Sequence, residues 1–493
     1  MMDYRMAVEL DAFLRKICEA YEKSGTEMLR ELGCRLKRLT LPESMERTQL
    51  QLEYEVSLLL MLRKVADLLE AAEDPAATIS AIQNMRESLS RDRRALKIAF
   101  FVHEFSLWPS FQTVWEACGE DIERDLVLVY ASWDGRPTDH EIEKLMKPYQ
   151  EAGYPVRWME DYNPAAENPD IVFFMKPYEG FRACPGKYYI NEIEKITPYT
   201  VFISYCLDVQ GGELLQEYFY GQPFFYHAWR IIGYSEYYRQ KMVERGYRDG
   251  ENVVLLGHPK FDVSFRLAAQ RAYVHPEWES KIAGRKVILW NAHFTVEPGE
   301  GVGTYFLWKD VIFGYFRQHR EMVLLWRPHP LFWESMERRP DVDEFRQLIT
   351  QLETWDNVII DQSGDYRYSF CMSDALISDA ATFLVEYAAS GKPVLYLVKE
   401  DGEKVCNDDY LVGMQTAYCA EDLTTFFDDV KSGAAAQNAE VRKAQFQKIF
   451  GICDGTIGKR ILEYVRKEVD AAISEKAEKR MNLLEAGKTH DLE

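Results

Sequence analysis

The chain has 493 residues, 47% of them hydrophobic and 28% charged, which is typical of a globular protein with about two or three domains. Acidic residues number 80 against 59 basic ones, a formal net charge of -21, so the basic excess that nucleic-acid binding requires is missing. The nine cysteines are scattered without a Cys-x-x-Cys pair, which indicates reduced thiols in a cytoplasmic protein. The charged start predicts no signal peptide, and the apolar run Leu58–Leu62 is too short to cross a bilayer.

Residues 1–95 are predicted to form an all-helical extension. Apolar residues recur at helical spacing from Leu50 to Leu69, and Asp74-Pro75 is expected to end that helix before a shorter one, Thr78 to about Leu89. Three roles are open to this extension: docking on the rest of the chain, pairing with a second subunit, or resting on a membrane surface. A basic hinge follows, typical of a solvated linker but also suited to anionic lipid. Its members are Arg91, Arg93, Arg94 and Lys97.

After residue 95, strand and helix patterns alternate, which predicts two α/β domains with mostly parallel sheets. The first domain is expected over residues 96–250, with strands at 98–102, 126–130, 156–159, 171–175, 201–204 and 231–232. The second is expected over residues 251–450, beginning near Val253, with strands at 287–290, 323–326, 358–360, 375–377 and 394–398. Residues 451–493 are predicted to form a helix from Ile457 to about Val469, crossing back over the cleft, and a charged tail.

The turn Ser378-Asp379-Ala380-Ala381-Thr382 connects an apolar strand to a helix and is the most informative stretch of the chain. Unpaired N–H groups and the positive end of the helix dipole meet at such a turn, so it suits a phosphate. Thr382 adds a hydroxyl donor, and Glu386, one turn further along the same face, is placed to accept a bond from a sugar hydroxyl. The alternative is an ordinary turn with Asp379 or Thr382 as helix cap.

Two further polar stretches follow buried strands, where ligands of parallel sheets bind. In Arg327-Pro328-His329-Pro330, the guanidinium fork of Arg327 suits a phosphate, and His329 can donate to a phosphate oxygen or protonate a leaving group. Asn291-Ala292-His293-Phe294-Thr295 follows another strand and is expected to face the same cleft. Its continuation, Glu297–Gly303, has the glycines of a mobile flap, with a plain loop as the alternative.

Taken together, these stretches resemble the CDP-glycerol glycerophosphotransferase family of the teichoic-acid polymerase type, over about residues 200–465. The stretches that carry the resemblance are Gly257–Asp262, Ile288–Thr295, Arg327–Pro330, Ser378–Thr382, and Asp454-Gly455 with Arg460. The resemblance implies a glycosyltransferase B fold, α/β with two Rossmann-like domains facing a cleft. It also implies a donor held mainly by the C-terminal domain, with no metal and no cofactor. The donor-binding residues expected from it and from the strand ends are Asn291, His293, Thr295, Arg327, His329, Ser378, Asp379, Ala381, Thr382 and Glu386.

The sequence departs from the family pattern in the first domain. The family's Trp-His-Gly-Thr-type segment carries the histidine expected to act as base, whereas the comparable stretch here, Phe202–Asp208, has none. His103, at the end of the first strand, is therefore the expected general base, with Asp208 and Glu104 as runners-up and a structural His103 as the alternative. Together with His329, His103 and Asp208 make up the expected catalytic set. A smaller departure is Ser-Asp-Ala-Ala-Thr in place of the family's Ser-Asp-Tyr-Ser-Ser.

The expected function is transfer of glycerol phosphate, or a related polyol phosphate, from a CDP-activated donor to a hydroxyl of a surface glycan or a lipid-linked, teichoic-acid-like acceptor. The alternatives are a nucleotide-sugar glycosyltransferase or epimerase of the same fold, and a non-catalytic nucleotide-binding scaffold. The aromatic stretch Tyr218–Trp229 is read as inter-domain core or, alternatively, as a platform for an acceptor or the membrane interface. The expected location is the cytoplasm, including the inner face of the membrane, and the N-terminal helices offer a contact between subunits.

Overall fold

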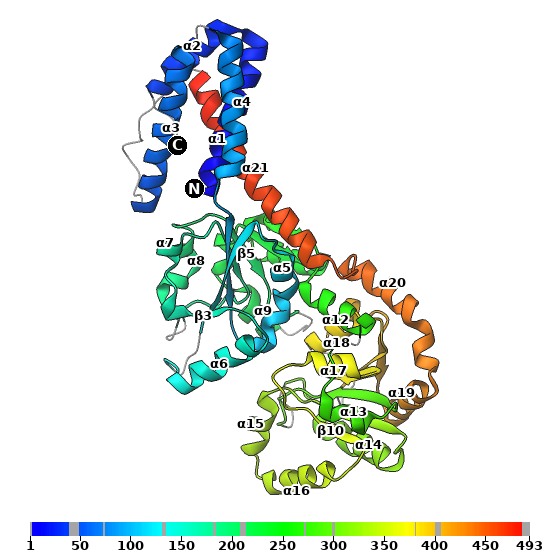
Figure 1. Ribbon diagram of the computed structural model, residues 1–493. Helices are drawn as coiled ribbons and strands as arrows, with labels where there is room; N and C mark the ends of the chain where they lie inside the picture. The colour runs from blue at the N-terminus through cyan, green and yellow to red at the C-terminus, as the bar shows by residue number, and fades with distance from the viewer. Residues whose placement is uncertain are drawn as a thin grey trace.

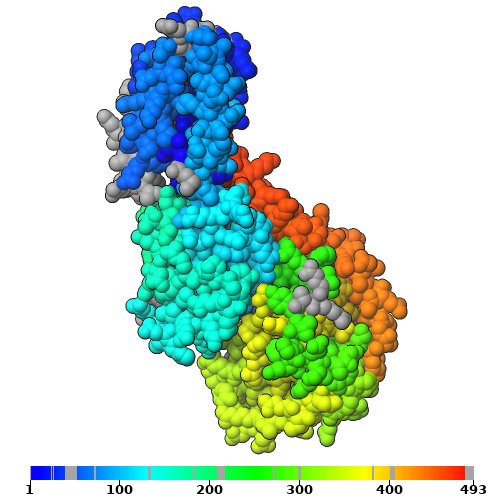
Figure 2. Space-filling model, in the orientation of Figure 1, coloured from blue at the N-terminus to red at the C-terminus, as the bar shows by residue number. Residues whose placement is uncertain are grey.

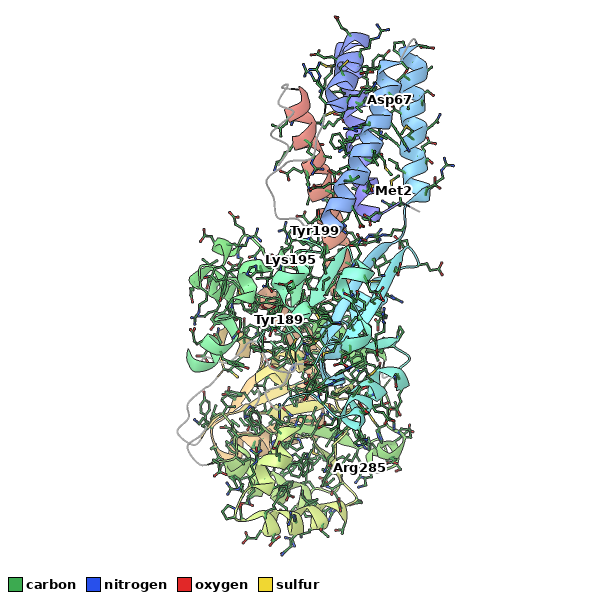
Figure 3. The ribbon with its side chains drawn as sticks, turned by 90° about the vertical axis from the view of Figure 1, so that its left-hand side faces the viewer. Met2, Asp67, Tyr189, Lys195, Tyr199 and Arg285 are labelled. Atoms are coloured by element: carbon green, nitrogen blue, oxygen red, sulfur yellow. The ribbon has the colours of Figure 1, made fainter. Side chains whose placement is uncertain are left out.

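The computed structural model describes residues 2–38, 49–71, 74–130, 135–180, 184–207, 213–270, 273–297, 301–379, 381–399 and 406–485. Three bodies follow one another along the molecule: a bundle of N-terminal helices, a first α/β domain and a second α/β domain (Figure 1). The helices form a separate lobe in the space-filling view (Figure 2). Seen from the side, Asp67 lies in this lobe and Arg285 lies in the α/β domain at the opposite end (Figure 3).

The N-terminal lobe is helical as predicted, over α1 (Tyr4–Ser24), α2 (Thr26–Lys37), α3 (Gln49–Glu70) and α4 (Pro75–Asp92). One boundary differs from the prediction. Asp74-Pro75 begins α4, because the Asp74 carboxylate accepts from the backbone N–H groups of Ala76 and Ala77 and the proline takes the first helical turn, where no N–H partner is needed. Among the described residues, no helix is long and apolar enough to cross a membrane.

The lobe docks on the rest of the chain through buried ion pairs. Asp170 is fully buried in the first domain, where Arg94 Nη1 donates to it at 2.5 Å and Arg5 Nε lies 3.2 Å from it. Arg94 also pairs with Asp3 of the lobe at 2.6 Å, whereas Lys97, in the first strand of the domain, pairs with Glu167 at 3.0 Å within that domain. Docking, one of the three expected roles, is thus confirmed, and two members of the basic hinge, Arg94 and Lys97, form ion pairs within the chain.

The first α/β domain is a seven-stranded, wholly parallel sheet in the order β3-β2-β1-β4-β5-β6-β7. Its strands are β1 (Leu96–Val102), β2 (Ile122–Leu128), β3 (Val156–Trp158), β4 (Ile171–Phe174), β5 (Thr200–Ile203), β6 (Arg230–Gly233) and β7 (Val253–Leu255). The helices between them are α5 (Gln112–Ala117), α6 (Asp139–Glu151), α7 (Pro164–Glu167), α8 (Ile190–Ile193), α9 (Glu213–Tyr220), α10 (Phe224–His227) and α11 (Glu236–Glu244). The expected second domain therefore begins too early at residue 251, because β7 pairs with β6 at the edge of the first sheet.

The second α/β domain is a six-stranded parallel sheet in the order β10-β9-β8-β11-β12-β13. Its strands are β8 (Lys286–Asn291), β9 (Met322–Trp326), β10 (Val358–Ile360), β11 (Ala375–Ser378), β12 (Val394–Leu397) and β13 (Gln415–Ala417), the last of which was not predicted. Its helices are α12 (Pro259–Gln270), α13 (Pro276–Ile282), α14 (Tyr305–Gln318), α15 (Leu331–Glu337), α16 (Val342–Glu353), α17 (Arg367–Met372), α18 (Ala381–Ala388), α19 (Ala420–Ser432) and α20 (Ala439–Phe450). Buried apolar strands and covering helices confirm the predicted fold class.

The last helix, α21 (Ile457–Glu485), joins all three bodies (Figure 1). It starts beside α12, packs on α5 of the first domain and continues along α1 of the N-terminal lobe. Gly458 allows this close packing, since a Cβ there would lie 2.3 Å from the carbonyl carbon of Thr113 in α5. The helix crosses back as expected but is much longer than the sequence pattern suggested.

Candidate functional site

The carboxyl ends of β8 and β11 lie side by side at the centre of the second sheet, where the strand order reverses. Ligands of open parallel sheets bind outside such a point, because the loops leaving the two strands diverge. Ser378 ends β11 and donates to Asn291 Oδ1 at 3.3 Å, and Asn291 Nδ2 donates to the carbonyl oxygen of Arg327 at 2.8 Å. Both side chains are buried, so they fasten three strand ends together beneath the site.

Asp379 holds two loops of the site in place. Its Oδ1 accepts from the backbone N–H of His293 at 2.8 Å, and its Oδ2 accepts from Thr304 N at 2.6 Å and Thr304 Oγ1 at 2.9 Å. Burial raises the pKa of Asp379 to about 6, against the lowering effect of these hydrogen bonds. We expected this carboxylate to contact the donor, but it is 1% exposed and instead positions the His293 loop against the start of α14.

Thr295 has a similar internal role. Its hydroxyl accepts from the backbone N–H groups of Val302 at 3.2 Å and Gly303 at 2.9 Å, so it holds the end of the expected flap. A Cβ on Gly303 would lie 2.0 Å from the carbonyl oxygen of Thr295, which explains the glycine. Residues 298–300 of that loop lie outside the described part of the chain.

Two imidazoles remain to face a ligand at this end of the sheet. His293 Nδ1 accepts from the backbone N–H of Thr295 at 3.2 Å, and His329 Nδ1 accepts from that of Leu331 at the same distance. Since a backbone N–H can only donate, the proton of each neutral ring lies on Nε2. The ring centroids are 6.0 Å apart, with Phe294 packed against both rings. The pair therefore offers two neighbouring N–H donors to the oxygens of a phosphate or diphosphate.

Arg327 does not offer its fork to a ligand as we expected. Its side chain is 7% exposed; Nη1 donates to Asp361 Oδ2 at 2.6 Å and Nη2 to the carbonyl oxygen of Ser363 at 2.8 Å. Asp365 in turn pairs with Arg367 at 2.6 Å. Asp361 and Asp365 are thus both engaged by arginines. Within the described ranges, no group of three His, Cys, Asp or Glu side chains could hold a metal ion.

The helix after the Ser-Asp-Ala-Ala-Thr turn meets the first domain. Ala381 begins α18, and the Thr382 hydroxyl donates to the carbonyl oxygen of Leu207, just past β5, at 3.2 Å. Glu386 does not face the cleft: it is fully buried, accepts from Lys260 Nζ at 3.3 Å and also accepts from the Tyr366 hydroxyl. The expected sugar contact of Glu386 is therefore replaced by an internal ion pair.

The Gly257–Asp262 stretch joins the two domains. His258 Nε2 lies 2.8 Å from the carbonyl oxygen of Ser204 at the end of β5, and Lys260 reaches Glu386 in α18. Asp262 accepts from the first backbone N–H groups of α21, at 3.0 and 2.8 Å, and so caps that helix. Asp262, in one of the stretches that carried the family resemblance, is therefore bonded to the backbone between Gly455 and Arg460 of another.

On the first domain, His103 is buried, whereas the sequence predicted that it faces the cleft. Its residue is 8% exposed, and burial lowers the pKa of its imidazole to about 3, which makes it a poor base at neutral pH. Asp208 lies outside the described residues. Glu104, the third candidate, has a side chain 49% exposed and pairs with Lys176 at 2.9 Å. Lys176 was missed, although a basic residue directly after a buried strand was a usable signal.

Four histidines near the two sheet ends share a lowered pKa, and burial is the main cause in each. The pKa is about 3 for His103, His258 and His293 and about 4 for His329. All four are neutral at pH 7. At that pH the imidazoles of His293 and His329 act as hydrogen-bond donors, not as cations.

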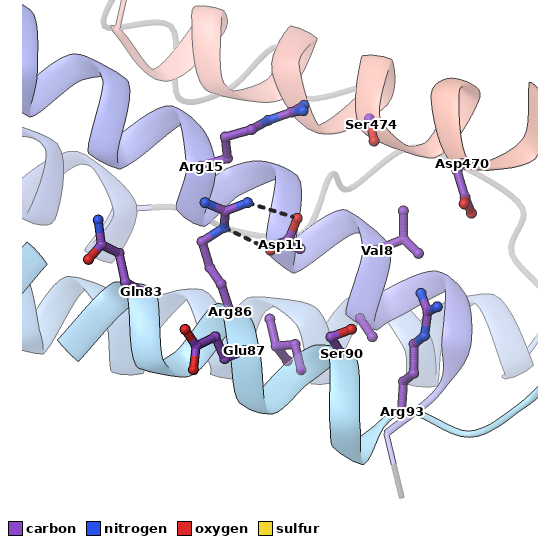
Figure 4. Close-up of a pocket in the computed structure, with 12 residues that line it drawn as sticks. Val8, Asp11, Arg15, Gln83, Arg86, Glu87, Ser90, Arg93, Asp470 and Ser474 are labelled. Atoms are coloured by element: carbon purple, nitrogen blue, oxygen red, sulfur yellow. Dashed lines mark hydrogen bonds and ion pairs between the residues drawn. The ribbon is translucent and has the colours of Figure 1, made fainter. Parts of the chain in front are cut away.

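A cavity of about 670 Å³ lies between α1, α4 and α21, away from the cleft (Figure 4). Its arginines are interleaved with acids: Arg86 donates to Asp11 at 2.8 Å, and Arg15 pairs with Glu478 at 3.2 Å. Asp470 lines the same cavity and accepts from the Tyr4 hydroxyl at 2.8 Å. With its charges balanced internally, this cavity lacks the uncompensated positive charge that a phosphate site needs.

Comparison with known proteins gives a family match and several structural neighbours. Residues 229–467 match the family described as CDP-Glycerol:Poly(glycerophosphate) glycerophosphotransferase, and a search of curated proteins gives no match. The solved wall teichoic acid polymerase TagF is similar in structure, with a TM-score of 0.51, 12% identity, and coverage of 86% of this chain and 98% of that chain. A TagF variant soaked with CDPG gives a TM-score of 0.50 at 13% identity, over 86% of this chain and 98% of that one.

A second kind of neighbour is a putative UDP-N-acetylglucosamine 2-epimerase from Listeria monocytogenes. Its TM-score is 0.50 at 15% identity, over 76% of this chain and 96% of that chain. At such identities the likeness establishes the fold, two parallel-sheet domains of the glycosyltransferase B type. The resemblance drawn from the sequence motifs is confirmed by the family match: residues 229–467 of this chain are similar to the CDP-glycerol glycerophosphotransferase family.

Proposed function

We propose that this chain transfers glycerol phosphate, or a related polyol phosphate, from a CDP-activated donor to a hydroxyl of a surface glycan or teichoic-acid-like polymer. The observation that carries the proposal is the pair of neutral imidazoles at the switch point of the second sheet. His293 and His329 each present an Nε2–H within one site, 6.0 Å apart between ring centroids. The family match over residues 229–467 supports CDP-glycerol as the donor.

In the proposed reaction, the acceptor hydroxyl attacks the β-phosphorus of the donor. A new P–O bond forms, the bond from that phosphorus to the bridging oxygen breaks, and CMP leaves with the electron pair. His293 and His329 donate to phosphate oxygens that gain negative charge, which stabilises the transition state. The attacking hydroxyl loses its proton as the new P–O bond forms, so the step needs a base at the acceptor oxygen. We assign that proton to the carboxylate of Asp208, because, against the raising effect of burial, Lys176 and His103 lower the pKa of Glu104 to about 2.

An epimerase or glycosyltransferase acting on a UDP-sugar is the second candidate, favoured by the structural likeness to the Listeria protein. The same two N–H donors would serve any nucleoside diphosphate, so donor identity decides between the two functions. A protein that binds CMP or CDP-glycerol but transfers to no acceptor would instead be a scaffold.

Calorimetric titration with CDP-glycerol, CDP-ribitol, UDP-N-acetylglucosamine and CMP tests the proposal. CDP-glycerol is expected to bind best, and His329→Ala should weaken it about 10-fold to 150-fold, the effect of one hydrogen bond to a charged group. His319→Ala is the matched control, because His319 lies at the end of α14 and pairs with Glu321 at 2.9 Å. Preference for the UDP-sugar, or equal affinity of wild type and His329→Ala for every ligand, would refute the assignment.

A further inference from the structure

The first domain has a switch point of its own, between β1 and β4. Glu104 follows β1 and Lys176 follows β4, and their side chains pair at 2.9 Å with exposed fractions of 49% and 18%. Ligands of open parallel sheets bind outside the carboxyl ends of the strands at a switch point. This ion pair therefore lies at the position expected for a ligand of the first domain. The pair offers one cationic donor and one anionic acceptor, and its net charge is zero.

Tyrosines surround this pair. Lys176 Nζ lies 5.7 Å from the centre of the Tyr205 ring, and the Tyr205 and Tyr178 hydroxyls are 3.1 Å apart. Tyr178 stacks on Tyr218 with ring centroids 4.8 Å apart and an angle of 27° between the rings. Tyr218 is 51% exposed, whereas most of the aromatic stretch around it is buried as core. Aromatic faces and hydroxyls therefore adjoin a neutral ion pair on one surface.

This surface belongs to the same cleft as the candidate donor site. Tyr205 lies two residues before Leu207, whose carbonyl oxygen accepts from the Thr382 hydroxyl of α18 at 3.2 Å. That bond brings the end of β5 against the turn after β11. A molecule resting on the tyrosines can thus present a hydroxyl toward the second domain.

We propose that Glu104, Lys176, Tyr178, Tyr205 and Tyr218 form an acceptor subsite for an uncharged sugar unit; the inference rests on the transferase function proposed above. A balanced lysine–carboxylate pair can bond neighbouring sugar hydroxyls as donor and acceptor at once. The negative face of an exposed tyrosine ring suits the C–H face of a sugar. Of the two acceptors named in the proposed function, the surface glycan is favoured over the polyanionic teichoic-acid-like polymer, because the pair has no spare positive charge and the chain carries a net charge of -21.

Binding of the full-length protein to an array tests this subsite without any donor. The probes are hexose-terminated and N-acetylhexosamine-terminated oligosaccharides, printed beside synthetic glycerol phosphate trimers. Binding is expected on sugar-terminated probes, and Tyr218→Ala should reduce it at least tenfold. The matched control is Tyr226→Ala, since Tyr226 is 55% exposed but packs against Tyr247, just before the amino end of β6.

Each outcome of the array experiment either supports or overturns the proposed acceptor subsite. Sugar binding that falls in Tyr218→Ala and in Lys176→Met but not in Tyr226→Ala supports the subsite. Binding only to the glycerol phosphate trimers, no binding to any sugar, or sugar binding unchanged in Tyr218→Ala overturns it. Titration of CDP-glycerol into Tyr218→Ala separates this result from the donor assignment, because donor affinity should stay at the wild-type value if only the acceptor subsite has been removed.

Discussion

The ion pair between Lys260 and Glu386 tests how the two domains are joined. Their side chains are 5% and 0% exposed, and the Lys260 ammonium lies 3.3 Å from the Glu386 carboxylate. The sequence suggested that Glu386 contacts the donor, whereas the structure places it in an internal pair. The two interpretations predict different results: loss of a donor contact lowers affinity, and loss of a buried partner lowers the free energy of unfolding.

Lys260→Met leaves the Glu386 carboxylate buried with only the Tyr366 hydroxyl as a described partner for it. Removing one member of a buried pair costs about 3–5 kcal/mol, because the other charge stays out of water without compensation. Glu386→Gln should cost a similar amount, since the amide keeps the Tyr366 contact but leaves the Lys260 charge unpaired. Replacing both removes both charges, so the double variant should be more stable than the sum of the two losses predicts, by up to about 3 kcal/mol.

Urea unfolding at several pH values measures these losses. Burial already raises the pKa of Glu386, with Lys260 and then Tyr366 opposing it, so the pKa should rise further in Lys260→Met. A carboxyl whose pKa is raised in the folded state stabilises the fold at low pH, and this contribution is lost as pH rises. The free energy of unfolding of Lys260→Met should therefore recover toward the wild-type value near pH 4. The opposite result would show that Glu386 faces the cleft. In that case each single variant would lose less than about 1 kcal/mol of unfolding free energy, the two losses would add in the double variant, and Glu386→Gln would bind the donor more weakly.

Two further predictions concern packing and pH. Gly458→Ala should lower the thermal unfolding midpoint, because its Cβ would overlap Thr113, at a cost of about 1–3 kcal/mol or more. The control is Gly314→Ala, within α14, which should leave the midpoint unchanged or raise it because no atom lies near its Cβ. Equal shifts of the midpoint in the two variants would contradict the packing argument. The four low-pKa histidines should make the fold acid-labile. Each is neutral in the folded protein but takes up a proton near pH 6.5 when the chain unfolds. The free energy of unfolding should therefore fall as pH drops from about 6.5 toward 4, by up to about 1.4 kcal/mol per pH unit for each histidine. Asp379, with its pKa raised to about 6, opposes this slope between about pH 4 and 6, and a urea midpoint that stays constant from pH 7 to pH 5 would contradict the prediction.

The sequence determined the elements and the class of fold. Strands of the two sheets are nearly continuous apolar runs, as strands covered on both faces must be, and alternation with helices requires parallel pairing. The pattern could not assign Val253–Leu255 to the first sheet, because a short apolar strand carries no information about its neighbours. The sequence pattern did not predict the three-residue strand Gln415–Ala417 either, because it lies at a sheet edge and is mostly polar, so it lacks an apolar run.

For the site, the sequence located the loops, and the tertiary structure decided which atoms are available. His293 and His329 follow strands whose carboxyl ends must meet at one edge, so their proximity was predictable. The internal partners of Arg327, Asp379 and Glu386 were not, since each lies on a different element and only the folded chain brings them together. A buried charge must be paired, and the pairing that satisfies it here engages these three groups internally. The two neutral imidazoles are left as the groups that we propose to meet the donor.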